Sequence, residues 1–275
     1  MIWRFCLFSL IGVLLNAQEI PRSKVNLRSQ DKEAALGAQL ANEVRNRTSS
    51  LGDAAVLGFV EDVGWRLAPH VTGANSHWEF AVIRDDAGGN THEPLSMPGG
   101  YIFVPANLIL EANNEAELAG MLAHAMAHVA AIHQSFGEEA RLAGTPLIFL
   151  GGWMGEGAPT AMPLGFLQIQ RKKELDADRA AVNVMAAAGY NPAAFVDYIR
   201  RAQPALSGDA GKYSPLPLRD KRISALETAA ATLAPGSRTN SDIFIAIQER
   251  VRELVTSSAG DVPSEEPPAL RRKNE

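Results

Sequence analysis

Cysteine is almost missing from this 275-residue chain: Cys6 is the only one, and it lies inside an N-terminal apolar run. If that run is removed, the remaining chain has no disulfide and no thiolate ligand for a metal ion. Any metal ion would then have to be held by histidine, aspartate or glutamate side chains.

An excess of one charge sign is also missing. The formal net charge of −5 gives no electrostatic reason to expect binding to nucleic acid or to an anionic membrane surface. The composition, 46% hydrophobic and 21% charged, is that of an ordinary globular protein and excludes disorder of the whole chain. No internal repeat is visible, which argues against a solenoid.

The N-terminal apolar run, residues 5–15, is too short to span a bilayer, because a spanning helix needs about 20 residues. It follows Arg4 and precedes Ala17, a small residue at a suitable cleavage point. The pattern predicts a signal peptide over residues 1–17 and a periplasmic or secreted protein. The alternative is an uncleaved N-terminal anchor. We expect no spanning helix in the mature chain, although peripheral membrane contact stays open.

Apolar spacing predicts a mainly helical α+β domain with a small β-sheet over residues 18–256, and a disordered proline- and charge-rich tail over residues 257–275. Residues 143–166 are apolar but interrupted by glycine and proline, which predicts a loop or lid. Phe59, Trp65 and Phe103 are expected in the core.

The individual elements follow from capping residues and periodicity. Helices are expected over residues 31–47, 56–67, 114–133, 168–188 and 219–232, another after Asn191-Pro192, and a last one that carries Ile243, Ile247, Val251 and Leu254 on one face. Strands are expected over residues 78–83 and 101–104, with a turn over residues 85–90.

Two histidines, His124 and His128, are four residues apart on one predicted helix. This spacing puts both imidazoles on one face, about one turn apart, which suits a single Zn²⁺. Histidines in the core or partly exposed to solvent are the alternative, and the pair alone favours that alternative. His133 falls off this face, and His70, His77 and His92 are expected at the surface or in turns.

Two carboxylates, Glu174 and Asp178, show the same spacing on a later predicted helix. Two histidines and one glutamate, with a fourth position open, form the ligand set of a catalytic zinc. Asp178 could then accept the second ring N–H of a ligand histidine and fix its tautomer. The alternative is a solvated charged face, which spacing alone would favour.

Longer stretches around these residues resemble metallopeptidase family 48, which includes the CAAX prenyl endopeptidase, the heat-shock protease HtpX and periplasmic outer-membrane-assembly peptidases. The resemblance rests on residues 98–104, 114–129, 174–179 and 188–192, in that order. It implies a zincin-like domain with one Zn²⁺ per chain. It assigns His124, His128 and Glu174 as zinc ligands, with Asp178 as the partner of a ligand histidine.

The chain departs from the family pattern at two positions. The family motif HExxH has a glutamate after its first histidine, but here the motif is His-Ala-Met-Ala-His, with Ala125 at the position of the general base. Zinc lowers the pKa of a bound water to about 7, yet a carboxylate must still take the proton and pass it to the leaving amine. The family also has a histidine near the C-terminal end of the domain, where this chain has Ser214. Together these losses indicate a naturally decayed catalytic site.

Three hypotheses follow. The leading one is an exported zinc-binding protein of this family with weak or absent proteolysis, in effect a pseudoenzyme that binds peptides or unfolded envelope proteins. The second is an active zinc-dependent metalloendopeptidase of the envelope, in which water or another side chain replaces the missing base. The third is a metal-free interaction protein on the same fold.

Overall fold

The computed structural model describes residues 30–73, 77–84, 93–135, 164–206, 214 and 216–259. The expected signal peptide, the turn over residues 85–90 and nearly all of the expected loop or lid and of the C-terminal tail lie outside these residues. The helices are α1 (Gln30–Arg47), α2 (Ala54–Leu67), α3 (Ala106–Glu111), α4 (Glu115–Ser135), α6 (Leu164–Ala187), α7 (Ala193–Ala202), α9 (Arg219–Ala230) and α10 (Asp242–Ala259). The expected mainly helical α+β architecture is confirmed.

A small mixed sheet accompanies the helices. Its strands are β1 (Glu79–Ile83), β2 (Leu95–Met97) and β3 (Tyr101–Pro105), in the order β1-β3-β2. β3 runs parallel to β1 and antiparallel to β2. The sequence did not predict β2, because three residues are too few for an alternating pattern. A tight 3-10 turn, Pro98–Gly100, joins β2 to β3, and Gly99 and Gly100 both have positive φ angles there.

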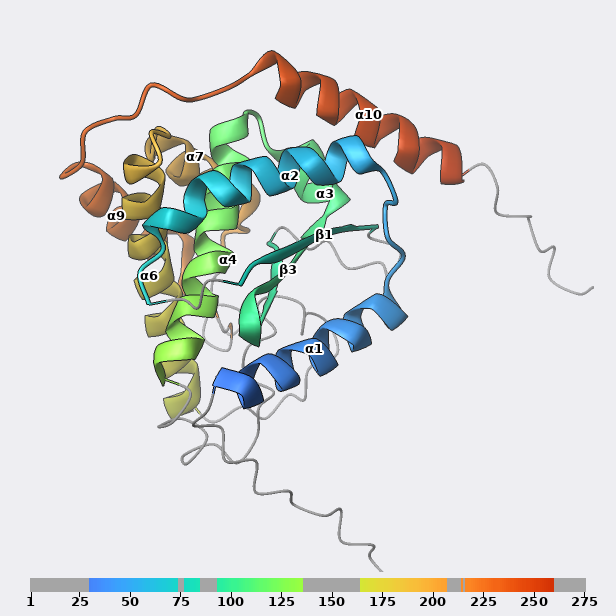
Figure 1. Ribbon diagram of the computed structural model, residues 1–275. Helices are drawn as coiled ribbons and strands as arrows, with labels where there is room; N and C mark the ends of the chain where they lie inside the picture. Colours follow the sequence, from blue (N-terminus) through green and yellow to red (C-terminus); the bar gives the residue numbers. More distant parts are fainter. Residues whose placement is uncertain are drawn as a thin grey trace, which may run out of the picture.

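The sheet is covered on both faces, with α1 and α2 on opposite sides of it (Figure 1). On one face, Ala41 and Val44 of α1 pack with Leu95 and Phe103 in a small core cluster. The other face contributes to the main core, where α2 and α4 pack. Both faces of this sheet, which has three strands among the described residues, therefore pack into hydrophobic core.

Helix α4 runs through the main core and carries the histidine pair. The side chain of Asn114 caps the helix, because it accepts a hydrogen bond from the Glu117 amide at 3.0 Å. Glu117 in turn accepts one from the Asn113 amide at 2.7 Å. Nearly every described residue of α4 is buried, and α6 packs along it.

Three predictions about side chains and bounds were wrong. In α10, Ile243 is 66% exposed and Phe244 is buried instead, because the ring of Phe244 packs against Phe59 at a centroid distance of 5.8 Å. Trp65 is half exposed and lies edge-on against Phe80 rather than in the core. Helix α6 begins at Leu164, inside the segment expected to be a loop.

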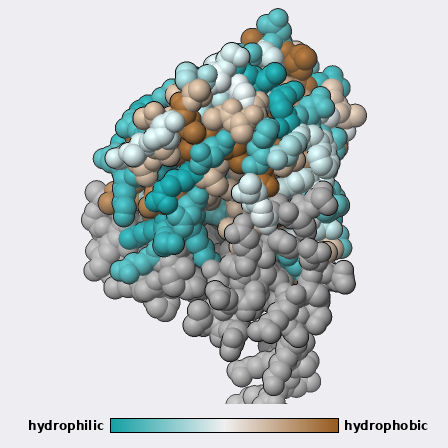
Figure 2. All heavy atoms as spheres, turned by 60° about the vertical axis from the view of Figure 1, so that its left-hand side comes forward, coloured by the Kyte–Doolittle hydropathy of each residue, from teal (hydrophilic) through white to brown (hydrophobic). Residues whose placement is uncertain are grey.

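On the face drawn in Figure 2, hydrophilic residues predominate and apolar residues form separate spots. Among the described residues, no helix combines the length and the apolar character that crossing a membrane requires.

Candidate metal centre

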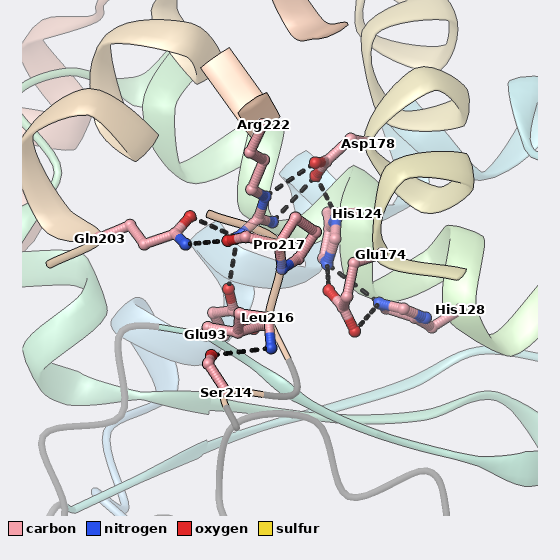
Figure 3. A network of polar contacts seen from close by, with 10 residues as sticks. All are labelled: Glu93, His124, His128, Glu174, Asp178, Gln203, Ser214, Leu216, Pro217 and Arg222. Carbon is pink, nitrogen blue, oxygen red and sulfur yellow. Dashed lines mark hydrogen bonds and ion pairs between the residues drawn. The ribbon is translucent and has the colours of Figure 1, made fainter. Parts of the chain in front are cut away.

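The structure brings His124, His128 and Glu174 together where α4 and α6 pack (Figure 3). Their ligand-type atoms all lie within 4.8 Å of one another. His124 Nε2 is 3.3 Å from one Glu174 oxygen, and His128 Nε2 is 3.5 Å from the other. The two Nε2 atoms are 3.0 Å apart. Helices α4 and α6 thus bring these three side chains to one point.

The donor atoms fit a cation. Glu174 Oε2 and His124 Nδ1 are both buried, and neither makes a hydrogen bond of good geometry to a described residue, although Asp178 lies 2.9 Å from His124 Nδ1. The two Nε2 atoms lie 3.0 Å apart, and each faces one Glu174 oxygen, at 3.3 and 3.5 Å. Zn²⁺ binds tetrahedrally to such nitrogen and oxygen donors and would satisfy all three at once. The residues present therefore suit zinc.

Asp178 lies behind His124 and is fully buried. One of its oxygens is 2.9 Å from His124 Nδ1, on the side of the ring opposite Glu174. This arrangement favours the tautomer with hydrogen on Nδ1, which leaves Nε2 free to bind a metal. The ring of Phe195 on α7 also contacts His124, with centroids 5.9 Å apart.

Arg222 on α9 holds Asp178 from its other side. Its guanidinium is completely buried and donates to both carboxylate oxygens, at 2.7 and 2.9 Å. A third nitrogen donates to Glu93 at 3.1 Å and to Gln203 at 3.3 Å. Gln203 donates onward to the Pro217 carbonyl at 2.8 Å.

Glu93 and Gln203 were missed altogether. Glu93 stands two residues before β2, and Gln203 follows α7, so neither belongs to a local motif with the histidines. Only the packing of the helices and the short strand brings them to Arg222. No spacing signal in the sequence could have found them.

The electrostatics of the site favour a divalent cation. Burial opposes the charged form of His124, but the carboxylates of Asp178 and Glu174 outweigh it and raise the pKa of His124 to about 9. Burial likewise opposes ionisation of both acids, yet Arg222 lowers the pKa of Asp178 and the histidines lower the pKa of Glu174. With neutral imidazoles, the carboxylates of Glu93, Glu174 and Asp178 and the single guanidinium leave a formal charge of −2. A Zn²⁺ ion balances this charge.

The structure also places Ala125 and Ser214, the two residues that depart from the family pattern. Ala125 follows His124 on α4, is 1% exposed, and offers no carboxylate. The hydroxyl oxygen of Ser214 accepts a hydrogen bond from the Leu216 amide at 3.1 Å, and its carbonyl accepts one from Arg171. Figure 3 shows Ser214 beyond Leu216 and Pro217 from the histidines.

Two of the other four histidines are placed relative to this group. His70 and His77 are not part of it, and His77 is exposed. His92 lies outside the described residues, as does the side chain of His133, so these two predictions stay untested.

Curated relatives share moderate similarity with this chain. A Vibrio cholerae protein provisionally named a beta-barrel assembly-enhancing protease is 27% identical over 186 residues, which are 62% of this chain and 38% of that protein. The beta-barrel assembly-enhancing proteases of Yersinia pestis and Escherichia coli K12 are 23% and 20% identical over 81% and 85% of this chain. The chain spans 49% and 51% of the length of these two.

A family model covers most of the described domain. The model of Peptidase family M48 matches residues 58–230. This range exceeds half of the chain and includes α4 with its histidine pair, α6 with Glu174 and Asp178, and Arg222 on α9. The resemblance noted from the short motifs is thereby confirmed, and the chain belongs to peptidase family M48.

Proposed function

We propose that this protein is an exported, zinc-binding member of the family with weak or absent peptide-bond hydrolysis, and that it binds peptides or unfolded envelope proteins. One observation carries the proposal. The group formed by His124, His128 and Glu174 is complete, whereas the next residue after His124 is the buried Ala125.

The ligand residues would hold one Zn²⁺ per chain, and Asp178 would orient His124 through Nδ1. When bound, zinc supplies a Lewis acid that polarises a peptide carbonyl and acidifies water. The residue at position 125 is not one of the three ligands, so its side chain is not needed to hold the metal ion. Zinc binding can therefore outlast the loss of catalysis.

Proton transfer is the step that this chain lacks. Ala125 has no group that takes a proton from water or gives one to a leaving amine. The acids near the metal group are already engaged: Glu174 faces the histidines, and Asp178 and Glu93 are bound by Arg222. Loss of a general acid–base group lowers rates by roughly 10²- to 10⁴-fold, so we expect hydrolysis near background.

Three features support peptide binding and a place in the envelope. Among the described residues, β2 is the last strand in the order β1-β3-β2, so an extended peptide could pair with its outer edge. The relatives are named as beta-barrel assembly-enhancing proteases, which points to proteins of the bacterial outer membrane as partners. The short apolar run at residues 5–15 is consistent with export.

An active zinc metalloendopeptidase is the second candidate. The complete ligand group and the relatives named as proteases favour it. A metal-free interaction protein is the third, favoured because protonated His124 between Asp178 and Glu174 gives the buried charges partners without a metal ion.

Restoring the missing carboxylate separates the first two candidates. Ala125→Glu should give chelator-sensitive cleavage of an unfolded protein such as fluorescently labelled casein, while the wild type stays near background. Ala125→Gln is the matched control, because it adds the same bulk to a buried position without a base. Robust wild-type cleavage, abolished by His124→Ala, would contradict the proposal and support the second candidate.

A further inference from the structure

Glu93 is the one acid of the network that contacts neither histidine, yet it is bound to the residue that holds Asp178. Its carboxylate accepts a hydrogen bond from Arg222 at 3.1 Å and is only partly exposed to solvent. It belongs to the short segment that leads into β2. We propose that Glu93 is a positioning residue for the metal centre, acting on His124 through Arg222 and Asp178.

The contacts form one continuous chain. Glu93 binds one terminal nitrogen of Arg222, and the other two nitrogens of the guanidinium bind Asp178. The Asp178 oxygen Oδ1 accepts a hydrogen bond from Arg222 Nη2. The same oxygen lies 2.9 Å from His124 Nδ1. Because a guanidinium is a rigid planar fork, fixing one of its edges fixes the direction of the others.

Charge explains why the outer acid matters. Arg222 is completely buried, and a buried charge is costly unless it is paired and hydrogen-bonded. Without Glu93, its third nitrogen would keep only the neutral amide oxygen of Gln203, at the longer distance of 3.3 Å. Asp178 would then be the sole anion hydrogen-bonded to Arg222.

The consequence falls on the metal ligand. An Asp178 carboxylate drawn more strongly to Arg222 holds the Nδ1–H of His124 less firmly and makes Nε2 a weaker donor. Groups that orient a ligand histidine typically contribute 10- to 100-fold to metal affinity. Glu93, which precedes β2, would thus raise the affinity of the site for zinc.

The proposal rests on the zinc binding proposed above, and its test uses two readouts. The first is zinc affinity by chelator competition on the full chain, and the second is the ¹H resonance of the His124 Nδ1–H in metal-free protein. We expect Glu93→Ala to weaken zinc binding about tenfold or more and to broaden or shift that resonance. Glu93→Gln, which keeps an acceptor for Arg222, should recover part of both.

The matched control is Glu227→Gln, which removes the same charge from an exposed pair with Arg200. It should change neither readout. Unchanged zinc affinity and an unchanged His124 resonance in both Glu93 variants would overturn the proposal, even if their melting temperatures fall. If the wild type binds no zinc, the proposed function fails, and the His124 resonance still decides the role of Glu93.

Discussion

Asp178 and Arg222 form a completely buried ion pair with two hydrogen bonds, of 2.7 and 2.9 Å, between α6 and α9. The pair ties the helix that carries Glu174 to a helix near the C-terminal end of the family match. It also stands directly behind His124, whose Nδ1 is 2.9 Å from Asp178. One contact therefore serves both the packing of the domain and the geometry of the metal centre.

Arg222→Ala should be severely destabilising. Removing one partner of a buried pair leaves the other charge unpaired, which typically costs about 3–5 kcal/mol of unfolding free energy. Urea denaturation of the metal-free protein measures this loss. Arg200→Ala, in an exposed pair with Asp197 and Glu227, should cost less than about 1 kcal/mol. Equal losses in the two variants would show that the Asp178 pair is not an essential contact.

The pH dependence of zinc binding should follow His124. Because the folded-state pKa is raised from 6.5 to about 9, the proton on His124 stabilises the metal-free fold fully below pH 6.5, and this contribution is lost as pH rises through 9. Zinc must displace that proton. Zinc affinity should therefore rise about tenfold per pH unit between these values and level off above them. Chelator competition across this range checks the slope, and a flat profile would contradict it.

Asp53 should contribute acid-sensitive stability at the start of α2. Its carboxylate caps the helix through the amides of Ala55 and Val56 and binds Arg250 of α10. The hydrogen bond from Arg250 is the largest cause that lowers its pKa from 3.8 to about 2. The contribution is present above pH 4 and is lost as pH falls through 2.

Asp53→Ala should lower the unfolding free energy by about 1 kcal/mol, the usual cost of a lost N-cap. Asp53→Asn keeps a capping side chain without the charge, so its melting temperature should change less between pH 4 and 2 than that of the wild type. Thermal unfolding over this pH range is the measurement. Parallel pH profiles for wild type and Asp53→Asn would argue against a titrating Asp53.

A histidine at position 214 should not improve a catalytically restored variant. The sequence placed Ser214 where the family has a histidine, but its hydroxyl pairs with the Leu216 amide, and the residue stands beyond Pro217 from the metal group. Ser214→His added to Ala125→Glu should therefore cleave casein at the rate of Ala125→Glu alone. A large gain at equal zinc content would show that position 214 reaches the cleft.

Helical spacing and helix caps account for the site residues that could be identified from the sequence. The pair His124 and His128, and the pair Glu174 and Asp178, are each visible because one helical turn defines them, and the caps of α4 mark its start. Their meeting depended on the family resemblance rather than on spacing. The roles of Glu93 and Gln203 could not be predicted, because their contacts with Arg222 arise only from tertiary packing.

The last helix shows a different limit. Ile243, Phe244 and Ile245 are consecutive apolar residues, so periodicity alone cannot decide which one faces the core. Contact with Phe59 decides in favour of Phe244. Strand β2 escaped detection because its three residues, Leu95–Met97, are all buried and show no alternation.

Chelators should lower the stability of the wild type but not that of a ligand variant. A ligand that binds only the folded state stabilises it by about 2.7 kcal/mol at 100 times its Kd. His128→Ala removes one of the three donors and should lose both the bound zinc and the sensitivity to chelators. Melting curves with and without EDTA test this, and equal shifts in the two proteins would rule out a specific effect at this site.

The metal content of the purified wild-type chain tests the central claim most directly. Protein expressed with added zinc, then dialysed and analysed by mass spectrometry for metals, should contain one zinc per chain, because Ala125 leaves His124, His128 and Glu174 intact. Wild-type protein that is folded but free of metal after that preparation would contradict the account.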